Sequence, residues 1–600
     1  MHYMLTYLVQ LFGFDSSHPL LFTQIHFWVF FLIVFAGFSF IVTRRWRLTV
    51  RNAYLFFFSL LFYYKTSGTF VLLLFFSTLL GWLLGIGMDR SFSRPLRKLM
   101  MAVGVTLNLL MLFFFKYAYF FTDIFNATFR TDYHIAIHIL LPVGISFYTF
   151  QNISYLVDVY KRKIAHVSNV FDFGFYTSFF PQLVAGPILR ADQFVPQLYK
   201  PFFISRRQFG IAVFWILNGL VKKLVLSDYL AVNFVDRIFE NPSLYTPFEN
   251  TSALMLYSLQ VYADFSGYTD IAIGVSMLMG FYLPVNFNSP YKAQNPTDFW
   301  RRWHISLSRW LRDYLYIPLG GNRTSGWLSY TLLAAVLAIA AFRLRSTAFS
   351  VAVLVVALAI AVCYIFRPDR RRSLGTNVNN MDTMLLGGLW HGASFNFITW
   401  GGLNGIGILV YKWWKEQGWI THILTLAAAT LLFTIARAVY PAPLLNMLQF
   451  ICLVCFIVYT VLHLLPQTWR FTRRSWIVWF TLLTFVFISF TRLFFRSGSN
   501  LDPAEANEVA WMTASLMVNQ IGSHWDLSQI PVIVGHYWKP FALFALGMVV
   551  HWLPARFKRR YRLWFSWMPL WLMVLVVVAT VFVLYQFVTA DLQPFIYFQF

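Results

Sequence analysis

The stretch NPTDFWRRWHISLSRWLRDYLYIPLGGNR, residues 295–323, decides the class of fold. Placed on a helix at about 100° per residue, it separates aromatic and apolar side chains from arginines. A basic amphipathic helix of this kind is typical of a membrane interface, where its cations meet the lipid headgroups. The sequence therefore predicts one interfacial helix here. Its apolar face holds Trp300, Trp303, His304, Leu307, Leu311 and Tyr314, and its basic face holds Arg301, Arg302, Arg309 and Arg312.

The rest of the chain supplies the membrane segments that such an interfacial helix accompanies. Of its 600 residues, 59% are hydrophobic and 12% are charged, whereas soluble domains carry about 25% charged residues. Apolar runs near the roughly 20-residue length that spans a bilayer recur from one end to the other. We therefore predict an all-α polytopic membrane protein with about 13 to 16 spanning or re-entrant segments. Residues 1–50 lack the features of a signal peptide and are expected to remain as an N-terminal membrane anchor.

The net charge is +24, with 47 Lys and Arg against 23 Asp and Glu. In a soluble protein this excess would indicate a nucleic-acid partner, but here the basic residues gather in short loops between apolar runs, as at 44–51, 90–98 and 556–560. The positive-inside rule accounts for that pattern, so we expect membrane lipids as partners and no nucleic acid. Segments 240–251 and 497–529, which are richer in acid and hydroxyl groups, are interpreted as external loops.

Three cysteines, Cys363, Cys452 and Cys455, lie in apolar runs. The Cys-x-x-Cys spacing of the last two is compatible with redox or metal chemistry. No cluster of His or carboxylate residues lies near them in sequence, however, and free cysteines pack as small hydrophobes. We therefore expect neither a metal site nor a structural disulfide.

A single histidine interrupts the apolar stretch DTMLLGGLWHGASFNFITW, residues 382–400. An ionisable side chain at bilayer depth costs about 2.5 to 3.5 kcal/mol on insertion scales, so His391 is rarely there without a use. Small residues on both sides allow a ligand or another backbone to come close, and Trp390 and Asn396 lie beside it in sequence. A neutral imidazole can accept a proton from a hydroxyl group. His391 is thus either a catalytic base or a packed core histidine, and His304 on the aromatic face of residues 295–323 is also compatible with a packed histidine that forms one hydrogen bond.

Two further polar stretches interrupt the apolar background. FFPQLVAGPILRADQF, residues 179–194, contains helix-breaking Pro and Gly; it is either a loop between spans or a re-entrant segment that lines a funnel with Gln182 and Arg190. In VYADFSGYTDIAIG, residues 261–274, carboxylates lie in an apolar helical context, where such groups face the interior and find partners. Asp264 is either a structural hydrogen-bonding group or a catalytic one that pairs with an Arg or orients a His.

The two histidine-containing blocks, residues 294–323 and 385–405, together with QLVAGPILR and YADFSGYTDIAIG upstream, resemble the membrane-bound O-acyltransferase (MBOAT) family. They are most similar to its bacterial branch of alginate O-acetyltransferases, from about residue 51 to the C-terminus. The resemblance implies the MBOAT fold: helices around a central funnel, plus interfacial and re-entrant helices. It also implies a multi-pass location in the bacterial cytoplasmic (inner) membrane.

In function, the resemblance implies transfer of an acyl group, usually acetyl, from a cytoplasmic thioester donor across the membrane to an extracytoplasmic polysaccharide or a partner acyltransferase. The essential histidine of that family corresponds to His391, which we expect to be the general base, and the second to His304, a candidate to orient the donor or polarise its carbonyl. Acetyl-coenzyme A is the expected donor substrate, with no bound cofactor. An SGNH-type extracytoplasmic acyltransferase and a polysaccharide synthase are the implied partners. Candidates to bind the donor or line the funnel are Trp303, Arg301, Arg302, Arg309, Arg312, Asp264, Gln182, Trp390 and Asn396.

One feature departs from the family pattern. His304 and His391 are 87 positions apart, and two apolar runs between them predict an inserted helical hairpin that turns near residues 343–347. The expected division of the chain is an anchor at 1–50, a first part of the MBOAT core at 51–323, the inserted hairpin at 324–372, a second part of the core with the catalytic His at 373–495, an extracytoplasmic loop at 496–540 and C-terminal transmembrane helices at 541–600.

Two alternative functions come from other classes. A D-alanyl transferase of the teichoic-acid type would take its acyl group from a carrier protein and would need an exposed docking groove. A non-enzymatic glycan transporter would show paired half-repeats with broken helices in matching positions, and no such symmetry is evident in the sequence.

Overall fold

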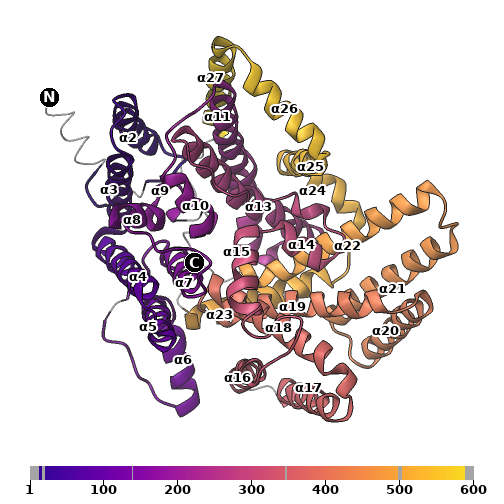
Figure 1. Ribbon diagram of the computed structural model, residues 1–600. Coiled ribbons are helices and arrows are strands. Elements are labelled where there is room, and N and C mark those ends of the chain that lie inside the picture. Colours follow the sequence, from indigo (N-terminus) through magenta and orange to yellow (C-terminus); the bar gives the residue numbers. More distant parts are fainter. Residues whose placement is uncertain are drawn as a thin grey trace.

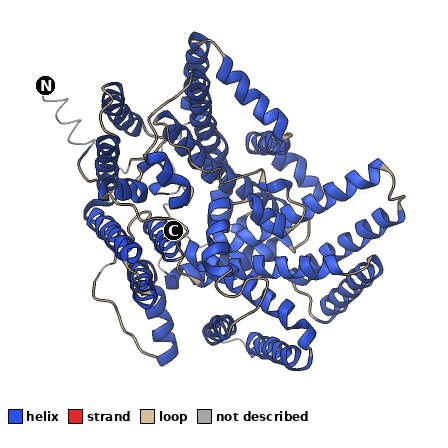
Figure 2. Ribbon diagram, viewed as in Figure 1, coloured by secondary structure: helices blue, strands red, loops and turns tan. Residues whose placement is uncertain are grey.

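The computed structural model describes residues 12–15, 20–137, 139–184, 186–344, 347–496 and 503–587. Every regular element in these ranges is a helix (Figure 2), which confirms the predicted all-α class. The α-helices before residue 320 are α2 Ile25–Thr43, α3 Leu48–Ser67, α4 Val71–Arg90, α5 Arg94–Leu112, α6 Ala118–Phe129, α7 Ile145–Tyr160, α8 Val170–Ser178, α9 Phe180–Leu183, α10 Ala191–Leu198, α11 Arg206–Val221, α12 Asp236–Glu240, α13 Pro247–Leu278, α14 Pro296–Arg302 and α15 Ile305–Leu311. Those after it are α16 Trp327–Leu344, α17 Thr347–Phe366, α18 Arg371–His391, α19 Phe395–Glu416, α20 Trp419–Val439, α21 Pro443–Leu464, α22 Arg470–Arg496, α23 Pro503–Ile521, α24 Ile530–His536, α25 Trp538–Trp552, α26 Ala555–Trp567 and α27 Leu570–Phe587. Short 3-10 and π-helical turns connect them: η1 Gly68–Phe70, η2 Phe113–Tyr117, η3 Lys222–Asp228, η4 Ala231–Val235, η5 Pro242–Leu244, η6 Pro290–Lys292, η7 Arg312–Tyr316, η8 Pro368–Arg370 and η9 Leu527–Gln529.

Eight helical segments of the described chain are long and apolar enough to cross a membrane, and the bent pair α24 and α25 raises the number to nine. The protein is thus a polytopic membrane protein, and its candidate spans are fewer than the expected 13 to 16 segments, a number that also included re-entrant segments. One reason is that helices join across π-helical turns into single long segments, as α5, η2 and α6 do over Arg94–Phe129. The eight segments are Ile25–Thr43, Leu48–Arg90, Arg94–Phe129, Arg206–Glu240, Trp419–Val439, Pro443–Leu464, Arg470–Arg496 and Leu570–Phe587.

Helix α13 lies at the centre of the molecule (Figure 1). A capping box begins it, because the hydroxyl of Thr246 accepts the N–H of Glu249 and the carboxylate of Glu249 accepts the N–H of Thr246. The helix then runs for 32 residues and is buried along most of its length, against α11, α22 and α23. In the view of Figure 1, helices α2 to α6 lie to the left of α13, and the α18–α19 pair lies below it.

Two large apolar clusters form the core, and α13 contributes to both. The first gathers rings from the N-terminal helices and includes Trp390. The second gathers rings from α19, α22 and the first half of α13, and includes Trp400 and Phe495. The ring of His391 contacts Trp390 as well as Trp400 and Phe495, so it lies where the two clusters meet.

The predicted single interfacial helix is wrong in one respect, because residues 295–323 form two short helices, α14 and α15, with a break at Trp303 and His304. At the break His304 has a left-handed backbone with φ of 44°, and the N–H of Ile305 donates to the carbonyl of Asn286. Helical periodicity cannot reveal this bond to a distant segment. The predicted separation of faces survives the break, with Trp303, His304 and Leu307 buried and Arg301, Arg309 and Arg312 exposed.

The region of the predicted inserted hairpin, residues 324–372, contains α16 and α17. These helices pack against each other and against α18. Helix α16 ends at Leu344 and α17 begins at Thr347; residues 345 and 346, within the predicted turn, lie outside the described ranges. Their apolar parts, Trp327–Ala341 and Val353–Phe366, are shorter than the eight candidate spans. Whether the hairpin crosses the membrane stays a prediction.

The predicted extracytoplasmic loop, residues 496–540, is largely helical in its described part. It contains α23, which packs against α13, α19, α21 and α22, so this part of the chain belongs to the packed fold. Residues 497–502 lie outside the described ranges. The side of the membrane on which the segment lies, and the other predicted domain boundaries, stay predictions.

The broken segment at residues 179–194 is buried over most of its described part, except for the half-buried Asp192 and the exposed Gln193. It contains the four-residue helix α9, then extended chain, then the start of α10. The N–H of Ile188 in the extended part donates to the hydroxyl of Ser306, at 3.0 Å. This segment therefore runs beside the turn that holds His304.

Candidate active site

The two predicted histidines lie together although 87 positions separate them in the sequence. His391 is the last residue of α18, and His304 immediately precedes α15. Their ring centroids are 6.5 Å apart, and their exposed fractions are 4% and 0%. At this separation, a carbonyl or hydroxyl group placed between the rings can form hydrogen bonds with both imidazoles.

Aromatic rings surround both imidazoles. The ring of His391 lies 5.1 Å from that of Trp400 and 5.3 Å from that of Phe495. Trp390 contacts both histidines, at 4.9 Å from His391 and 6.0 Å from His304. Burial among apolar groups disfavours a charged imidazolium, so the site favours the neutral form, which is the form that can accept a proton.

A turn with an unusual backbone positions His304. Its φ of 44° and ψ of 56° are left-handed, which is uncommon for a residue other than glycine. The side-chain oxygen of Asn286 accepts the N–H of Ser306 at 3.0 Å and its hydroxyl at 2.9 Å. Asn286 thus caps the start of α15 and holds the turn. The sequence analysis missed Asn286, because no local pattern links it to α15.

Side chains from the π-helical turn η2 hold the end of α18. The ammonium of Lys116 donates to the carbonyls of Trp390 at 2.7 Å and His391 at 3.1 Å. The hydroxyl of Tyr117 donates to the carbonyl of Leu389 at 3.0 Å. The sequence analysis missed these residues too, although a lone lysine in an apolar run is a signal of function.

Glycines bring the backbones of α18 and α19 close together behind the site. A Cβ atom on Gly388 would lie 2.3 Å from the carbonyl oxygen of Phe397, and one on Gly401 would lie 2.3 Å from that of Met384. Contacts this short do not occur between real atoms, so only glycine fits at these two positions. The close approach agrees with the expectation from the small residues around His391.

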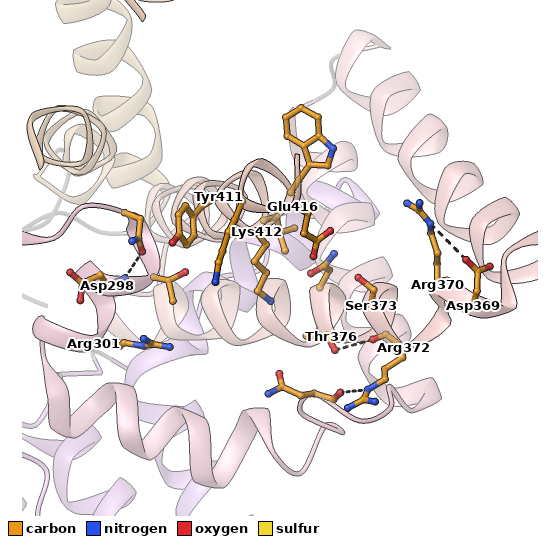
Figure 3. Close-up of a pocket in the computed structure, with 17 residues that line it drawn as sticks. Asp298, Arg301, Asp369, Arg370, Arg372, Ser373, Thr376, Tyr411, Lys412 and Glu416 are labelled. Carbon is orange, nitrogen blue, oxygen red and sulfur yellow. Dashed lines mark hydrogen bonds and ion pairs between the residues drawn. The ribbon is translucent and has the colours of Figure 1, made fainter. Parts of the chain in front are cut away.

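A polar pocket of about 980 Å³ lies at the other end of α18 (Figure 3). The first turns of α18, the last turns of α19 and the start of α14 line it. Because α18 rises 1.5 Å per residue, the 15 residues from Thr376 to His391 place the pocket about 22 Å from the histidine. Its basic side chains are Arg301, Arg370, Arg372, Lys412 and Lys415, and its acidic ones are Asp298, Asp369 and Glu416.

The structure brings only one of the four predicted arginines to this pocket, namely Arg301. Arg302 pairs with Asp298 at 2.9 Å, and Arg312 pairs with Asp313 at 2.6 Å, while Arg309 is exposed on α15. Although burial acts to raise it, hydrogen bonds from Arg312 and Arg190 hold the pKa of Asp313 below its ordinary value.

The pocket's other cations come from two further elements. Arg370 and Arg372 come from the end of the inserted hairpin and the start of α18, and Lys412 and Lys415 come from the end of α19. The sequence analysis had assigned basic residues of this kind only to membrane topology.

The remaining predicted residues have other partners. The carboxylate of Asp264 pairs with the ammonium of Lys223 at 2.6 Å. The side chain of Gln182 accepts a hydrogen bond from that of Gln151 at 3.1 Å. The guanidinium of Arg492 lies 4.3 Å from the ring centroid of Trp303.

Asn396 lies five residues after His391 in the sequence and is fully buried. Its amide donates to the carbonyl of Phe494 on α22 at 3.0 Å, and its side-chain oxygen accepts the hydroxyl of Ser394. These bonds tie the start of α19 to α22. Asn396 therefore supports the wall that carries Phe495, one of the rings beside His391.

Comparison with known proteins shows which family the chain resembles. A family model described as MBOAT, membrane-bound O-acyltransferase family, matches residues 158–342, which include His304 but end before His391. The chain is 36% identical over 389 residues to a probable alginate O-acetylase of Pseudomonas aeruginosa, a match that covers 64% of each chain. It is 35% identical over 390 residues to that of Pseudomonas putida, covering 64% of this chain and 68% of the relative.

A third relative is a peptidoglycan O-acetyltransferase of Helicobacter pylori, 32% identical over 380 residues, which are 59% of this chain and 63% of the relative. The matches span less than two thirds of the P. aeruginosa and H. pylori proteins. The identity with the P. putida protein and its coverage nevertheless establish the family. The chain belongs to the membrane-bound O-acyltransferase (MBOAT) family.

Proposed function

We propose that this protein is an O-acyltransferase that moves an acetyl group from a cytoplasmic thioester donor to a polysaccharide outside the cytoplasmic membrane. The observation that carries the proposal is the buried pair of His391 and His304, whose ring centroids are 6.5 Å apart. The names of the relatives support it, since two are alginate O-acetylases and one is a peptidoglycan O-acetyltransferase.

In the proposed reaction His391 is the general base. A hydroxyl oxygen of the acceptor, which is the polysaccharide or the partner acyltransferase, bonds to the carbonyl carbon of the thioester while the hydroxyl proton passes to the imidazole of His391. The carbon–sulfur bond then breaks, and the leaving thiolate takes that proton, so that the products are an ester and a free thiol. His304 donates a hydrogen bond to the carbonyl oxygen, on which negative charge develops.

Direct transfer needs no covalent acyl-enzyme. Ser394, three residues after His391, already donates its hydroxyl hydrogen to Asn396. It is therefore not arranged as a nucleophile that His391 activates.

The proposed donor is acetyl-coenzyme A, whose phosphates would bind in the basic pocket at the far end of α18 (Figure 3). Guanidinium groups such as those of Arg301 and Arg372 suit phosphate because they donate two parallel hydrogen bonds. Coenzyme A carries its thioester on a long flexible arm, which suits a pocket about 22 Å along α18 from His391.

The resemblance to alginate O-acetyltransferases extends the proposal to location and partners. We place the protein in the bacterial inner membrane, next to a polysaccharide synthase and an SGNH-type acyltransferase that completes transfer to the polymer. Neither partner is needed for the first chemical step, which the purified protein can be tested for alone.

The first test measures acetyl transfer and donor hydrolysis from radiolabelled acetyl-coenzyme A by the purified protein in nanodiscs. Wild type is compared with His391→Ala, and the control is His463→Ala, which changes a histidine on α21 that stacks on Trp419. We expect His391→Ala to lose about 100-fold or more in rate, and the control to keep the wild-type rate.

Three other results would contradict parts of the proposal. Equal rates in wild type and His391→Ala would show that His391 is not the general base. If wild type does not use acetyl-coenzyme A but does use an acyl group on a carrier protein, the proposed acetyltransferase would be replaced by a transferase of the D-alanyl type. Glycan export that persists in His391→Ala, without any acyl transfer, would indicate a transporter.

A further inference from the structure

Lys116 is the only charged residue between Lys98 and Asp123 in the sequence, within the candidate membrane span Arg94–Phe129. It belongs to the π-helical turn η2, which separates α5 from α6. Turns of this kind inside a helix are rare and often occur at functional sites. Within the described chain its ammonium forms no ion pair with a carboxylate; its hydrogen bonds go to the carbonyls of Trp390 and His391.

The target of Lys116 is the end of a helix. The last carbonyls of an α-helix have no donor within that helix, and α18 ends at His391 with an extended glycine after it. Lys116 and Tyr117 supply donors to the carbonyls of Leu389, Trp390 and His391. A cation at this position also interacts favourably with the negative end of the helix dipole.

We propose that Lys116 is a positioning residue for His391: its ammonium fixes the last turn of α18, aims the imidazole at His304 and keeps a positive charge beside the base. This inference rests on the proposed function, in which His391 accepts a proton. Tyr117 shares only the first of these tasks, because its hydroxyl is uncharged and bonds to Leu389, two residues before the histidine.

The charge has a consequence that a simple helix cap would not have. Burial is the largest cause that lowers the pKa of His391, and the charges of His304 and Lys116 add to it; α19 and α22 contribute Trp400 and Phe495 to its surroundings, and neither ring titrates. A nearby cation opposes protonation of an imidazole. Loss of the ammonium therefore makes His391 easier to protonate, and a protonated histidine cannot act as the base.

The test uses full-length protein in nanodiscs and compares Lys116→Met, Lys116→Arg and Tyr117→Phe with wild type. For Lys116→Met we expect kcat for acetyl transfer to fall about 100-fold, as for a small displacement of a catalytic group. We expect KM for acetyl-coenzyme A to stay within about twofold, and the acid limb of the pH profile to move to higher pH. Lys116→Arg, which keeps the charge and its donors, should recover most of the rate and the wild-type pH profile.

Tyr117→Phe keeps the charge and removes one hydrogen bond, so we expect a loss of roughly 3-fold to 10-fold without a shift in the pH profile. It also serves as the second variant if Lys116→Met does not fold, because a shifted pH profile in Tyr117→Phe would overturn the role of charge. A Lys116→Met protein with wild-type kcat and pH profile would overturn the proposal outright. His391→Ala is measured in parallel: if it retains activity, the proposed function has failed, whereas an inactive His391→Ala beside a normal Lys116→Met refutes only the role of Lys116.

Discussion

At the scale of single residues, two imidazoles meet that are held in place by different means. His391 is positioned through the backbone at the end of α18, whose carbonyls bond to Lys116. His304 is positioned through its own left-handed backbone and through the cap that Asn286 provides to α15. Because different residues hold the two histidines, substitutions of an imidazole can be compared with substitutions of the residues that position it.

His304→Asn tests the second imidazole with little disturbance of the turn. Asn tolerates the left-handed conformation better than most residues, so we expect the thermal unfolding temperature to stay close to that of wild type. Acetyl transfer should fall about 100-fold to 1000-fold, as when one donor to a developing oxyanion is removed.

The comparison variant is His304→Ala, which also lacks the imidazole. It should lose a similar amount of activity and, in addition, about 1 kcal/mol or more of stability, because alanine is strained in a left-handed backbone. A wild-type rate in His304→Asn would show that the ring only packs against Phe265 and Trp390.

At the scale of elements, the close pair α18 and α19 forms the back of the site. Gly388 and Gly401 face each other across this contact, since a Cβ atom on Gly401 would come within 3.2 Å of the Cα of Gly388. Close helix packing through glycine is common in membranes. Here it also fixes the distance between His391, at the end of α18, and Trp400, in α19.

Gly401→Ala is expected to push the two helices apart. Its Cβ would lie 2.3 Å from the backbone oxygen of Met384, which cannot move without the helix, so we expect a loss of about 1 to 3 kcal/mol in stability and a lower kcat. The matched control is Gly402→Ala, whose Cβ would meet only the flexible end of Leu385 at 3.4 Å. Equal unfolding temperatures and rates for the two variants would contradict the role assigned to the contact.

The same region shows what the sequence pattern can and cannot predict for an element. The small residues around His391 predicted close approach, because side-chain size acts wherever a helix packs. The break between α14 and α15 was not predicted, since it depends on hydrogen bonds that the N–H groups of Ile305 and Ser306 donate to Asn286, a residue outside the stretch. Residues 295–323 satisfy helical periodicity on both sides of that break, so the pattern alone reads as a single helix.

At the scale of the whole molecule, the start of α18 lines a basic pocket (Figure 3), and the end of the same helix carries His391 of the histidine pair. Three separate parts of the chain supply the pocket's cations, namely α14, the junction of η8 with α18, and the end of α19. Burial lowers the pKa of Lys412 there, and the neighbouring charge of Glu416 opposes that effect.

Arg301→Ala tests whether the pocket binds the donor, and a second arginine of the same stretch, Arg309, provides the control. Loss of one guanidinium that binds phosphate should raise KM for acetyl-coenzyme A by about 10-fold or more, leave kcat nearly unchanged and weaken the salt dependence of KM. Arg309→Ala is the control, because Arg309 is exposed on α15 and does not line the pocket. If the two variants have the same KM, the pocket does not bind the donor.

Composition and helical periodicity, which act within one segment, were enough to predict the all-α membrane class and the separation of aromatic from basic faces at residues 295–323. The choice of His304 and His391 as site residues came from the resemblance of their two sequence blocks to the MBOAT family. Only the tertiary structure decided that the histidines meet across 87 positions, that Lys116 binds the end of α18 and which cations share a pocket. Such contacts join segments far apart in the chain, and their partners are chosen by packing and by the need of buried carbonyls for donors, neither of which leaves a local pattern.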